Sequence, residues 1–254
     1  MKKIGITLSG GGARGIAHLG VLKALGEFGI KPDMISGASA GGIVGAFYAA
    51  GFSPREIMEI IKHADLFNIF SIKFHQGIFS MKSFEKIYMK HMPHNTFEGL
   101  NIPLYLAVTD IRKGETVYLS SGELAIALMA TSCVPVAFQA VEYQGTEYFD
   151  GGILNNLPVE PLIGQCEAQI GVHVNSIDRS SHKIETKDLI DRSFHLALSH
   201  TIKEKEDQFG LYIEPPGMSR FGMFDTDDFE QIFTVGYYYT LGIRDRIEAF
   251  QKNL

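Results

Sequence analysis

Residues 3–41 have the sequence KIGITLSGGGARGIAHLGVLKALGEFGIKPDMISGASAG, with two glycine-rich turns that each separate an apolar segment from a helical one. The apolar run Lys3–Ser9 predicts a short buried strand, and apolar residues at helical spacing follow from Ile16 to Phe28. A second strand is expected to begin at Asp33–Ser36, with a helix of small residues over Ala40–Ala50. This alternation predicts an α/β fold built on a parallel sheet.

The rest of the chain continues the pattern. Further strands are expected at Tyr105–Thr109, Thr116–Leu119, Val141–Tyr143, Thr146–Phe149 and Ala168–Val174. Helices are expected over Asp188–Asp207 and Asp227–Lys252, and capping-box spacings occur at Ser53/Glu56, Ser120/Glu123 and Asp227/Glu230. We therefore expect a mainly parallel sheet with helices on both faces, formed by a single domain over residues 1–254.

Composition excludes several classes of protein. Hydrophobic residues make up 45% of the 254 residues and charged residues 20%, which is incompatible with a disordered chain. The net charge of −6, without clustered Lys or Arg, argues against a nucleic-acid partner. Cys133 and Cys166 have no CxxC spacing, so no cysteine-based metal site is expected. The N-terminal apolar run is too short for a signal peptide. The uncharged segments contain glycine, serine or proline, so they do not resemble membrane spans. Both observations favour a cytoplasmic protein.

The first glycine turn, GGGARG at residues 10–15, places several backbone N–H groups at the start of a helix and so predicts an anion site. The same residues satisfy the dinucleotide-binding pattern GxGxxG, with Asp33 near the expected distance for a ribose-binding acid. Asp33, however, precedes the second strand, whereas that acid belongs at the carboxyl end of the strand. A tight turn without a ligand is the remaining alternative.

The second glycine turn, Gly37-Ala38-Ser39-Ala40-Gly41, is a GxSxG motif between a strand and a helix, the context of a nucleophile elbow. Gly37 and Gly41 would allow the strand and helix to approach each other closely, so that Ser39 projects from the sheet edge. The alternative is that Ser39 only caps the helix. In a parallel sheet both glycine turns emerge at one edge, where the loop amides could stabilise an oxyanion formed at Ser39.

A serine nucleophile needs a base, and Asp150 is a candidate. It ends the predicted hairpin and is followed by Gly151 and Gly152, which would let the backbone run close to the serine turn. Taken alone, an Asp-Gly pair is more often an ordinary turn.

The three motifs together resemble those of the bacterial patatin-like phospholipases, which are related to the α/β hydrolases: GGGARG at 10–15, GASAG at 37–41 and DGG at 150–152. The stretch 121–138, SGELAIALMATSCVPVAF, is also similar to the family's segment between serine and aspartate. The resemblance implies that Ser39 is the nucleophile and Asp150 its base, in a dyad without a third catalytic residue. It also implies an oxyanion loop formed by Gly10, Gly11, Gly12 and Arg14.

By this resemblance the protein is expected to be a serine acyl hydrolase that cleaves fatty acyl esters of phospholipids or lysophospholipids through an acyl-serine intermediate. No cofactor or metal is implied, and the partners are a lipid or ester substrate and, transiently, a membrane surface. The expected location is therefore the cytoplasm, with peripheral association at the membrane. Two alternatives are a carboxylesterase of small esters and a catalytically weak, lipid-binding regulatory protein.

The sequence leaves the roles of two groups of residues undecided. The histidines that follow Asp150 would permit a Ser, Asp, His order, although none lies in a recognisable motif: His173, His182, His195 and His200. His18, one helical turn after the glycine loop, is interpreted as a packed helix residue. Five phenylalanines could form an acyl groove or lid, or an ordinary core: Phe67, Phe70, Phe74, Phe79 and Phe84.

Overall fold

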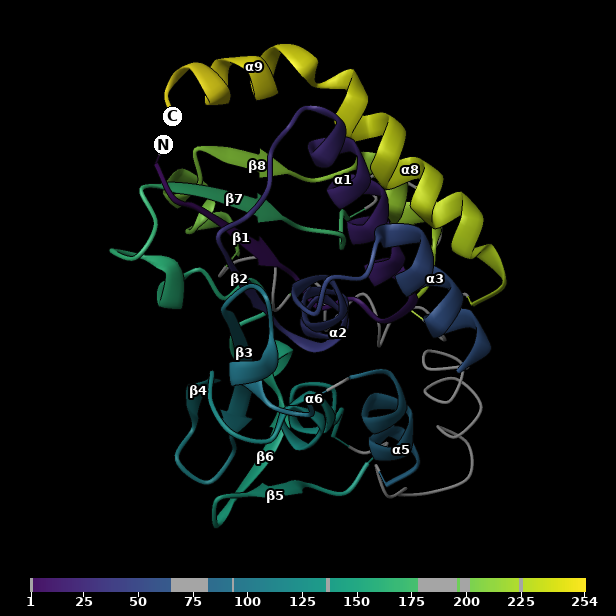
Figure 1. Cartoon of the computed structure of the whole chain (residues 1–254), viewed down its shortest axis with the longest axis vertical. Helices are drawn as coiled ribbons and strands as arrows, with labels where there is room; N and C mark the ends of the chain where they lie inside the picture. Colours follow the sequence, from purple (N-terminus) through teal and green to yellow (C-terminus); the bar gives the residue numbers. More distant parts are fainter. Residues whose placement is uncertain are drawn as a thin grey trace.

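The computed structural model describes residues 2–64, 82–92, 94–135, 138–177, 196, 202–223 and 226–254. Phe67, Phe70, Phe74 and Phe79, the side chain of Phe84, and His182, His195 and His200 lie outside the described residues, as does most of the helix expected over Asp188–Asp207. Within the described ranges the chain forms an eight-stranded sheet flanked by helices (Figure 1).

The sheet has a parallel centre and an antiparallel edge. Its strands are β1 (Ile4–Leu8), β2 (Met34–Gly37), β3 (Leu104–Asp110), β4 (Glu115–Leu119), β5 (Val141–Tyr143), β6 (Thr146–Asp150), β7 (Ala168–Val172) and β8 (Leu211–Ile213). β3, β2, β1, β7 and β8 are parallel neighbours in that order, whereas β4 and β6 pair antiparallel with β3, and β5 with β6. The mainly parallel sheet predicted from the sequence is confirmed.

β1 lies in the middle of the sheet, and its position determines where the two glycine turns leave the sheet. All five of its residues are buried, and its one hydroxyl, on Thr7, accepts a hydrogen bond from Ser36 over 3.0 Å. Leu8 is in register with Gly37 of β2 and with Val172 of β7. The turns that follow these three parallel strands therefore meet at one edge of the sheet.

Helices cover one face of the sheet. The helices of the described ranges are α1 (Ile16–Glu27), α2 (Ser39–Ala49), α3 (Pro54–His63), α5 (Lys82–His91), α6 (Leu124–Thr131), α8 (Phe229–Gly242) and α9 (Arg244–Lys252). β1, β2 and β3 follow one another across the sheet in a single direction. The helices after the first two of these strands, α1 and α2, therefore lie on the same face of the sheet, where α8 packs along α1 (Figure 1).

The opposite face has a different cover. Leu8 lies toward α2, whereas Gly5, on the other face of β1, lies against Leu162 of the 3-10 helix η4 (Glu160–Leu162). A second buried cluster continues this cover beside β7: Leu157, Val159, Ile202 and Phe209. Both faces of the central strands are thus closed to solvent, which is why these strands are apolar almost throughout.

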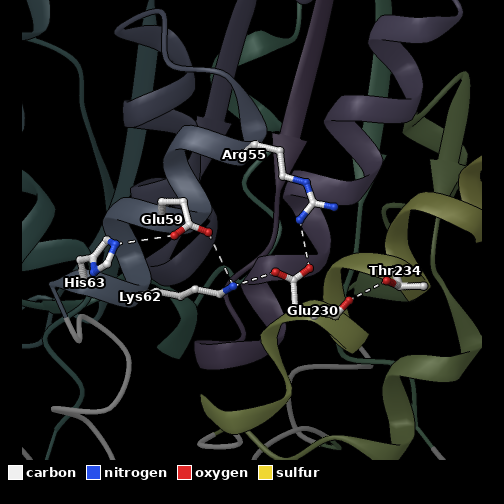
Figure 2. Close-up of polar contacts among 6 residues, drawn as sticks. All are labelled: Arg55, Glu59, Lys62, His63, Glu230 and Thr234. Carbon is white, nitrogen blue, oxygen red and sulfur yellow. Dashed lines mark hydrogen bonds and ion pairs between the residues drawn. The ribbon is translucent and has the colours of Figure 1, made fainter.

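Ion pairs on the surface join α3 to the start of α8 (Figure 2). Glu230 of α8 accepts hydrogen bonds from Arg55 over 3.0 Å and from Lys62 over 2.7 Å, both of α3. The Arg55 guanidinium also lies 4.3 Å from the ring centre of Phe233. Because the charged groups are largely exposed, each pair contributes roughly 0–1 kcal/mol, and their effect is to fix how the two helices lie against each other.

Some helix boundaries differ from the prediction. The capping box at Ser53/Glu56 is confirmed at the start of α3. The one expected at Ser120/Glu123 is wrong, because α6 begins at Leu124 and receives its first acceptors from Asn95, whose carbonyl and side-chain oxygen bind the N–H groups of Leu124 and Ala125. At the C-terminal end, α8 and α9 form two helices in place of one, divided at Ile243 after the weak helix former Gly242.

Among the helices of the described ranges, none has both the length and the apolar composition that a membrane crossing requires.

Candidate active site

Ser39 occupies a sharp turn between β2 and α2. It has a φ of +51°, a left-handed conformation that is unfavourable for a residue with a side chain. A Cβ on Gly41 would collide with the carbonyl oxygen of Leu8, and one on Gly37 would lie 2.7 Å from the amide nitrogen of Gly42. The two motif glycines therefore permit the close contact of strand and helix that holds Ser39 in this conformation.

The carboxylate of Asp150 faces this serine. Asp150 ends β6 and is buried, and its Oδ1 accepts the N–H of Gly152 over 2.7 Å. The side chain of Ser39 lies close enough to interact with the same carboxyl group. Burial raises the pKa of Asp150 from 3.8 to about 6, although the interactions with Ser39 and with the N–H of Gly152 act in the opposite direction. A carboxyl group with a pKa near 6 is suited to take and return a proton at neutral pH.

The glycine loop lies against the nucleophile turn. A Cβ on Gly10 would lie 3.1 Å from the Cβ of Ser39, so this glycine keeps the loop next to the serine. The N–H of Gly10 donates to the carbonyl of Asn156 over 3.2 Å. In the part of the chain that the structure describes, no acceptor binds the N–H groups of Gly11 and Gly12. These two N–H groups are therefore the candidate donors of the loop.

Arg14 has a different environment from the loop amides. Its side chain is buried, and its Nε donates to the carbonyl of Phe221 over 2.6 Å. The neighbouring N–H of Ala13 donates to the carbonyl of Met223 over 2.8 Å, and a Cβ on Gly12, whose φ is +56°, would collide with that carbonyl oxygen. The contact of Arg14 thus links the loop to residues 221–223.

Three polar residues complete the site but carry no recognisable motif. Thr131 accepts the backbone N–H of Ser39, Asn156 lies between the glycine loop and the turn after Asp150, and Asn175 donates its side-chain N–H to the carbonyl of Gly10. A signal existed for Asn175, since it follows a parallel strand that ends at the same sheet edge. Thr131 and Asn156 reach the site through contacts across the fold.

The described histidines lie apart from the candidate dyad. Among the described residues, the side chain of Asp150 accepts a hydrogen bond from the N–H of Gly152 and interacts with Ser39, and no histidine binds it. His173 is buried with its Nδ1 3.1 Å from Glu214 Oε1. His18 is a packed helix residue, as interpreted from the sequence. Its Nε2 donates to the carbonyl of Ser9 over 2.8 Å, and burial lowers its pKa to about 4.

Asp33 lies at the opposite edge of the sheet. Its Oδ2 accepts the N–H of Ile4 over 2.8 Å, at the amino end of β1, while the glycine loop follows the carboxyl end of that strand. This placement contradicts a ribose-binding role for Asp33 and removes the main support for a dinucleotide site. In the described ranges, no group of three or more His, Cys, Asp or Glu side chains is arranged to hold a metal ion.

The fold combines a parallel sheet, a strained serine at its carboxyl edge, a buried carboxyl group beside that serine and a glycine loop against it, which is the arrangement of the α/β hydrolase-like folds. The family model of the patatin-like phospholipases matches residues 6–163. The chain belongs to this family.

Comparisons with individual proteins agree with this assignment. The chain is 26% identical over 285 residues to lysophospholipase nte1 of Aspergillus fumigatus, covering 98% of this chain and 18% of that protein. It is 30% identical over 185 residues to an uncharacterized NTE family protein of Mycobacterium bovis, covering 68% of this chain and 49% of the relative. The chain thus spans less than half the length of either relative.

Two solved structures share the fold. VipD from Legionella pneumophila superposes with a TM-score of 0.57 at 15% identity, covering 98% of this chain and 67% of that one. ExoU from Pseudomonas aeruginosa, solved in complex with SpcU, gives a TM-score of 0.51 at 14% identity, covering 100% of this chain and 52% of that one.

Proposed function

We propose that the protein is a lipid acyl hydrolase that acts through a Ser39–Asp150 dyad. The observation that carries this proposal is the pairing of Ser39, held at a φ of +51°, with a buried carboxyl group that interacts with its side chain and whose pKa burial raises to about 6. Such a carboxylate can remove the serine proton directly, so a histidine between the two groups is not needed.

The reaction would proceed in two halves. Asp150 takes the proton of Ser39 as Oγ attacks the ester carbonyl, and the N–H groups of Gly11 and Gly12 stabilise the resulting oxyanion. Asp150 then returns the proton to the leaving alcohol as the ester bond breaks, which leaves an acyl-Ser39 intermediate. In the second half, Asp150 takes a proton from water, the hydroxide attacks the acyl group, and Ser39 regains its proton as the fatty acid leaves.

The proposed substrates are fatty acyl esters of lysophospholipids or phospholipids. The family and the name of the fungal relative, lysophospholipase, support this substrate class. These substrates are presented in micelles or bilayers, so the proposed reaction takes place at a lipid surface. The free N–H groups of the loop need no metal ion to polarise the ester, and we expect the activity to survive chelation.

Fatty acid release tests the proposal. The purified protein, Ser39→Ala and the control Ser36→Ala would be supplied with lysophosphatidylcholine, phosphatidylcholine and p-nitrophenyl butyrate. We expect the lipids to be hydrolysed by the wild type and the control, and by Ser39→Ala at no more than the background rate. Hydrolysis of the small ester alone would favour a carboxylesterase. Vesicle binding without turnover of any ester would favour a lipid-binding regulatory protein.

A further inference from the structure

Two carbonyl groups of the glycine loop accept hydrogen bonds from buried side chains. The carbonyl oxygen of Ser9 accepts from Nε2 of His18 over 2.8 Å, and that of Gly10 accepts from Nδ2 of Asn175 over 2.7 Å. Both His18 and Asn175 are almost completely removed from solvent. Because a carbonyl can only accept a hydrogen bond, the amide nitrogen of Asn175 must be the group that faces Gly10.

The geometry of the peptide group transmits this contact to the next residue. The peptide that joins Gly10 and Gly11 is trans, so its C=O and N–H point in opposite directions. With the carbonyl of Gly10 held by Asn175, the N–H of Gly11 is directed away from Asn175. This is one of the two loop N–H groups to which no described residue offers an acceptor.

The peptide groups before and after Gly10 differ in how the protein holds them. In the preceding peptide, the carbonyl of Ser9 is held by His18, and the N–H of Gly10 donates to the carbonyl of Asn156. That peptide is therefore fixed at both ends by the protein. Among the described residues, the Gly10–Gly11 peptide is held only at its carbonyl, by one side chain, and its N–H has no protein acceptor.

We propose that Asn175 is a positioning residue for ester hydrolysis: its amide holds the carbonyl of Gly10 so that the N–H of Gly11 is oriented toward the developing oxyanion. This inference rests on the proposed function of the Ser39 site. Asn175 would contact neither the substrate nor the reacting atoms and would act through the loop backbone alone.

The unusual surroundings of Asn175 support this assignment. Its Oδ1 is buried without a hydrogen-bond partner among the described residues, and a Cβ on Gly11 would lie only 2.9 Å from it. Burying an amide oxygen without a donor is unfavourable, and a fold retains such a group most readily where its other end has a function. Here the other end is the bond from Nδ2 to the loop.

The test compares Asn175→Ala and Asn175→Asp with the control Ser176→Ala. Aspartate has nearly the size of asparagine, but an ionised carboxylate cannot donate to Gly10. The control removes a neighbouring hydroxyl that donates to the carbonyls of Pro215 and Pro216, each over 3.1 Å. Each variant would be assayed with a p-nitrophenyl ester and with the matching thionoester, in which sulfur replaces the carbonyl oxygen. Sulfur accepts hydrogen bonds weakly, so the rate ratio of the two esters reports the oxyanion contacts.

We expect kcat for the oxygen ester to fall roughly tenfold to a hundredfold in both Asn175 variants, with KM changed less than about twofold. The ratio of oxygen-ester to thionoester rates should fall by at least about tenfold, and the control should keep both values. Since the ratio is taken within one variant, it does not depend on how much of that variant is folded. An unchanged ratio in the Asn175 variants would overturn the inference while leaving Ser39-dependent hydrolysis intact. Absence of Ser39-dependent hydrolysis in the wild type would overturn the proposed function and this inference with it.

Discussion

The backbone N–H of Ser39 donates to the hydroxyl oxygen of Thr131 over 3.1 Å, and that hydroxyl donates in turn to the carbonyl of Ala107 over 2.6 Å. Thr131 is the last residue of α6, and Ala107 lies in the middle of β3. One fully buried hydroxyl thus ties the strained serine to the central sheet. The bond helps to offset the unfavourable φ of Ser39, which an isolated turn would relax.

Replacing this hydroxyl should therefore impair the site. In Thr131→Val the N–H of Ser39 loses its acceptor while the volume is nearly kept, and we expect kcat to fall about tenfold and the free energy of unfolding by about 1–3 kcal/mol. Thr131→Ser keeps the hydroxyl and should retain most of kcat. The two variants are compared by ester hydrolysis and urea unfolding, and equal kcat values in both would contradict a role for the Ser39–Thr131 bond.

The local parts of the fold could be predicted from the sequence, because their signals lie within a few residues. The turn Gln144-Gly145 joins β5 and β6, and both of its residues have positive φ, as a two-residue hairpin requires. The start of α6 could not be predicted, since its acceptors come from Asn95, which is distant in sequence. The break between α8 and α9 could not be predicted either, because apolar spacing continues through it.

Some residues of the candidate site could be predicted from the sequence and others could not. Ser39 and Asp150 could be singled out because each lies in a short motif at the end of a predicted strand, and the parallel register of β1 with β2 explains why the two glycine turns meet. The contacts of Thr131 and Asn175 could not be predicted, because they are hydrogen bonds to residues far away in the sequence. The position of Asn175 after a parallel strand indicates the sheet edge at which it lies, but no spacing in the sequence encodes its partner.

Asp150→Asn should stabilise the fold at high pH. The pKa of Asp150 is about 6 in the folded state and near 3.8 when unfolded, so ionisation favours the unfolded chain. Below about pH 3 the carboxyl is protonated in both states. Between about pH 4 and pH 6 the unfolded chain ionises while the folded chain does not, so the destabilisation grows and levels off above pH 6 at about 3 kcal/mol. The neutral amide removes it, and we expect the variant to unfold at higher urea than wild type at pH 8, with little difference at pH 3. Equal stability at pH 8 would argue against a buried, ionised carboxylate.

The pH dependence of turnover should follow the same group. Because Asp150 must be ionised to accept the serine proton, kcat/KM is expected to rise with pH and level off above a midpoint of about 6. Lysophosphatidylcholine suits this assay, since its head group keeps the same charge between pH 5 and 8. A midpoint near pH 4 would mean that Asp150 titrates as an ordinary exposed carboxyl during catalysis.

Gly12→Ala tests the loop against a matched glycine. Gly12 and Gly114 both have positive φ, +56° and +70°, but a Cβ on Gly12 would collide with the carbonyl of Met223, whereas one on Gly114 meets nothing within 4 Å. Both alanine variants should lose roughly 1 kcal/mol of stability from backbone strain, and Gly12→Ala should lose more because of the collision with Met223. Only Gly12→Ala should also lose activity, by about tenfold or more, because the loop must shift. Similar activity losses in the two variants would remove the loop from the mechanism.

The most direct test of the dyad is the rate at which a fluorophosphonate modifies the protein, followed by intact mass and mapping of the adduct. We predict one adduct per chain, on Ser39. It should be absent in Ser39→Ala, at least about a hundredfold slower to form in Asp150→Asn, and formed at nearly the wild-type rate when alanine replaces His173, His182, His195 or His200 singly. An adduct on another residue, or a folded histidine variant as slow as Asp150→Asn, would contradict acyl transfer by Ser39 with Asp150 as its base.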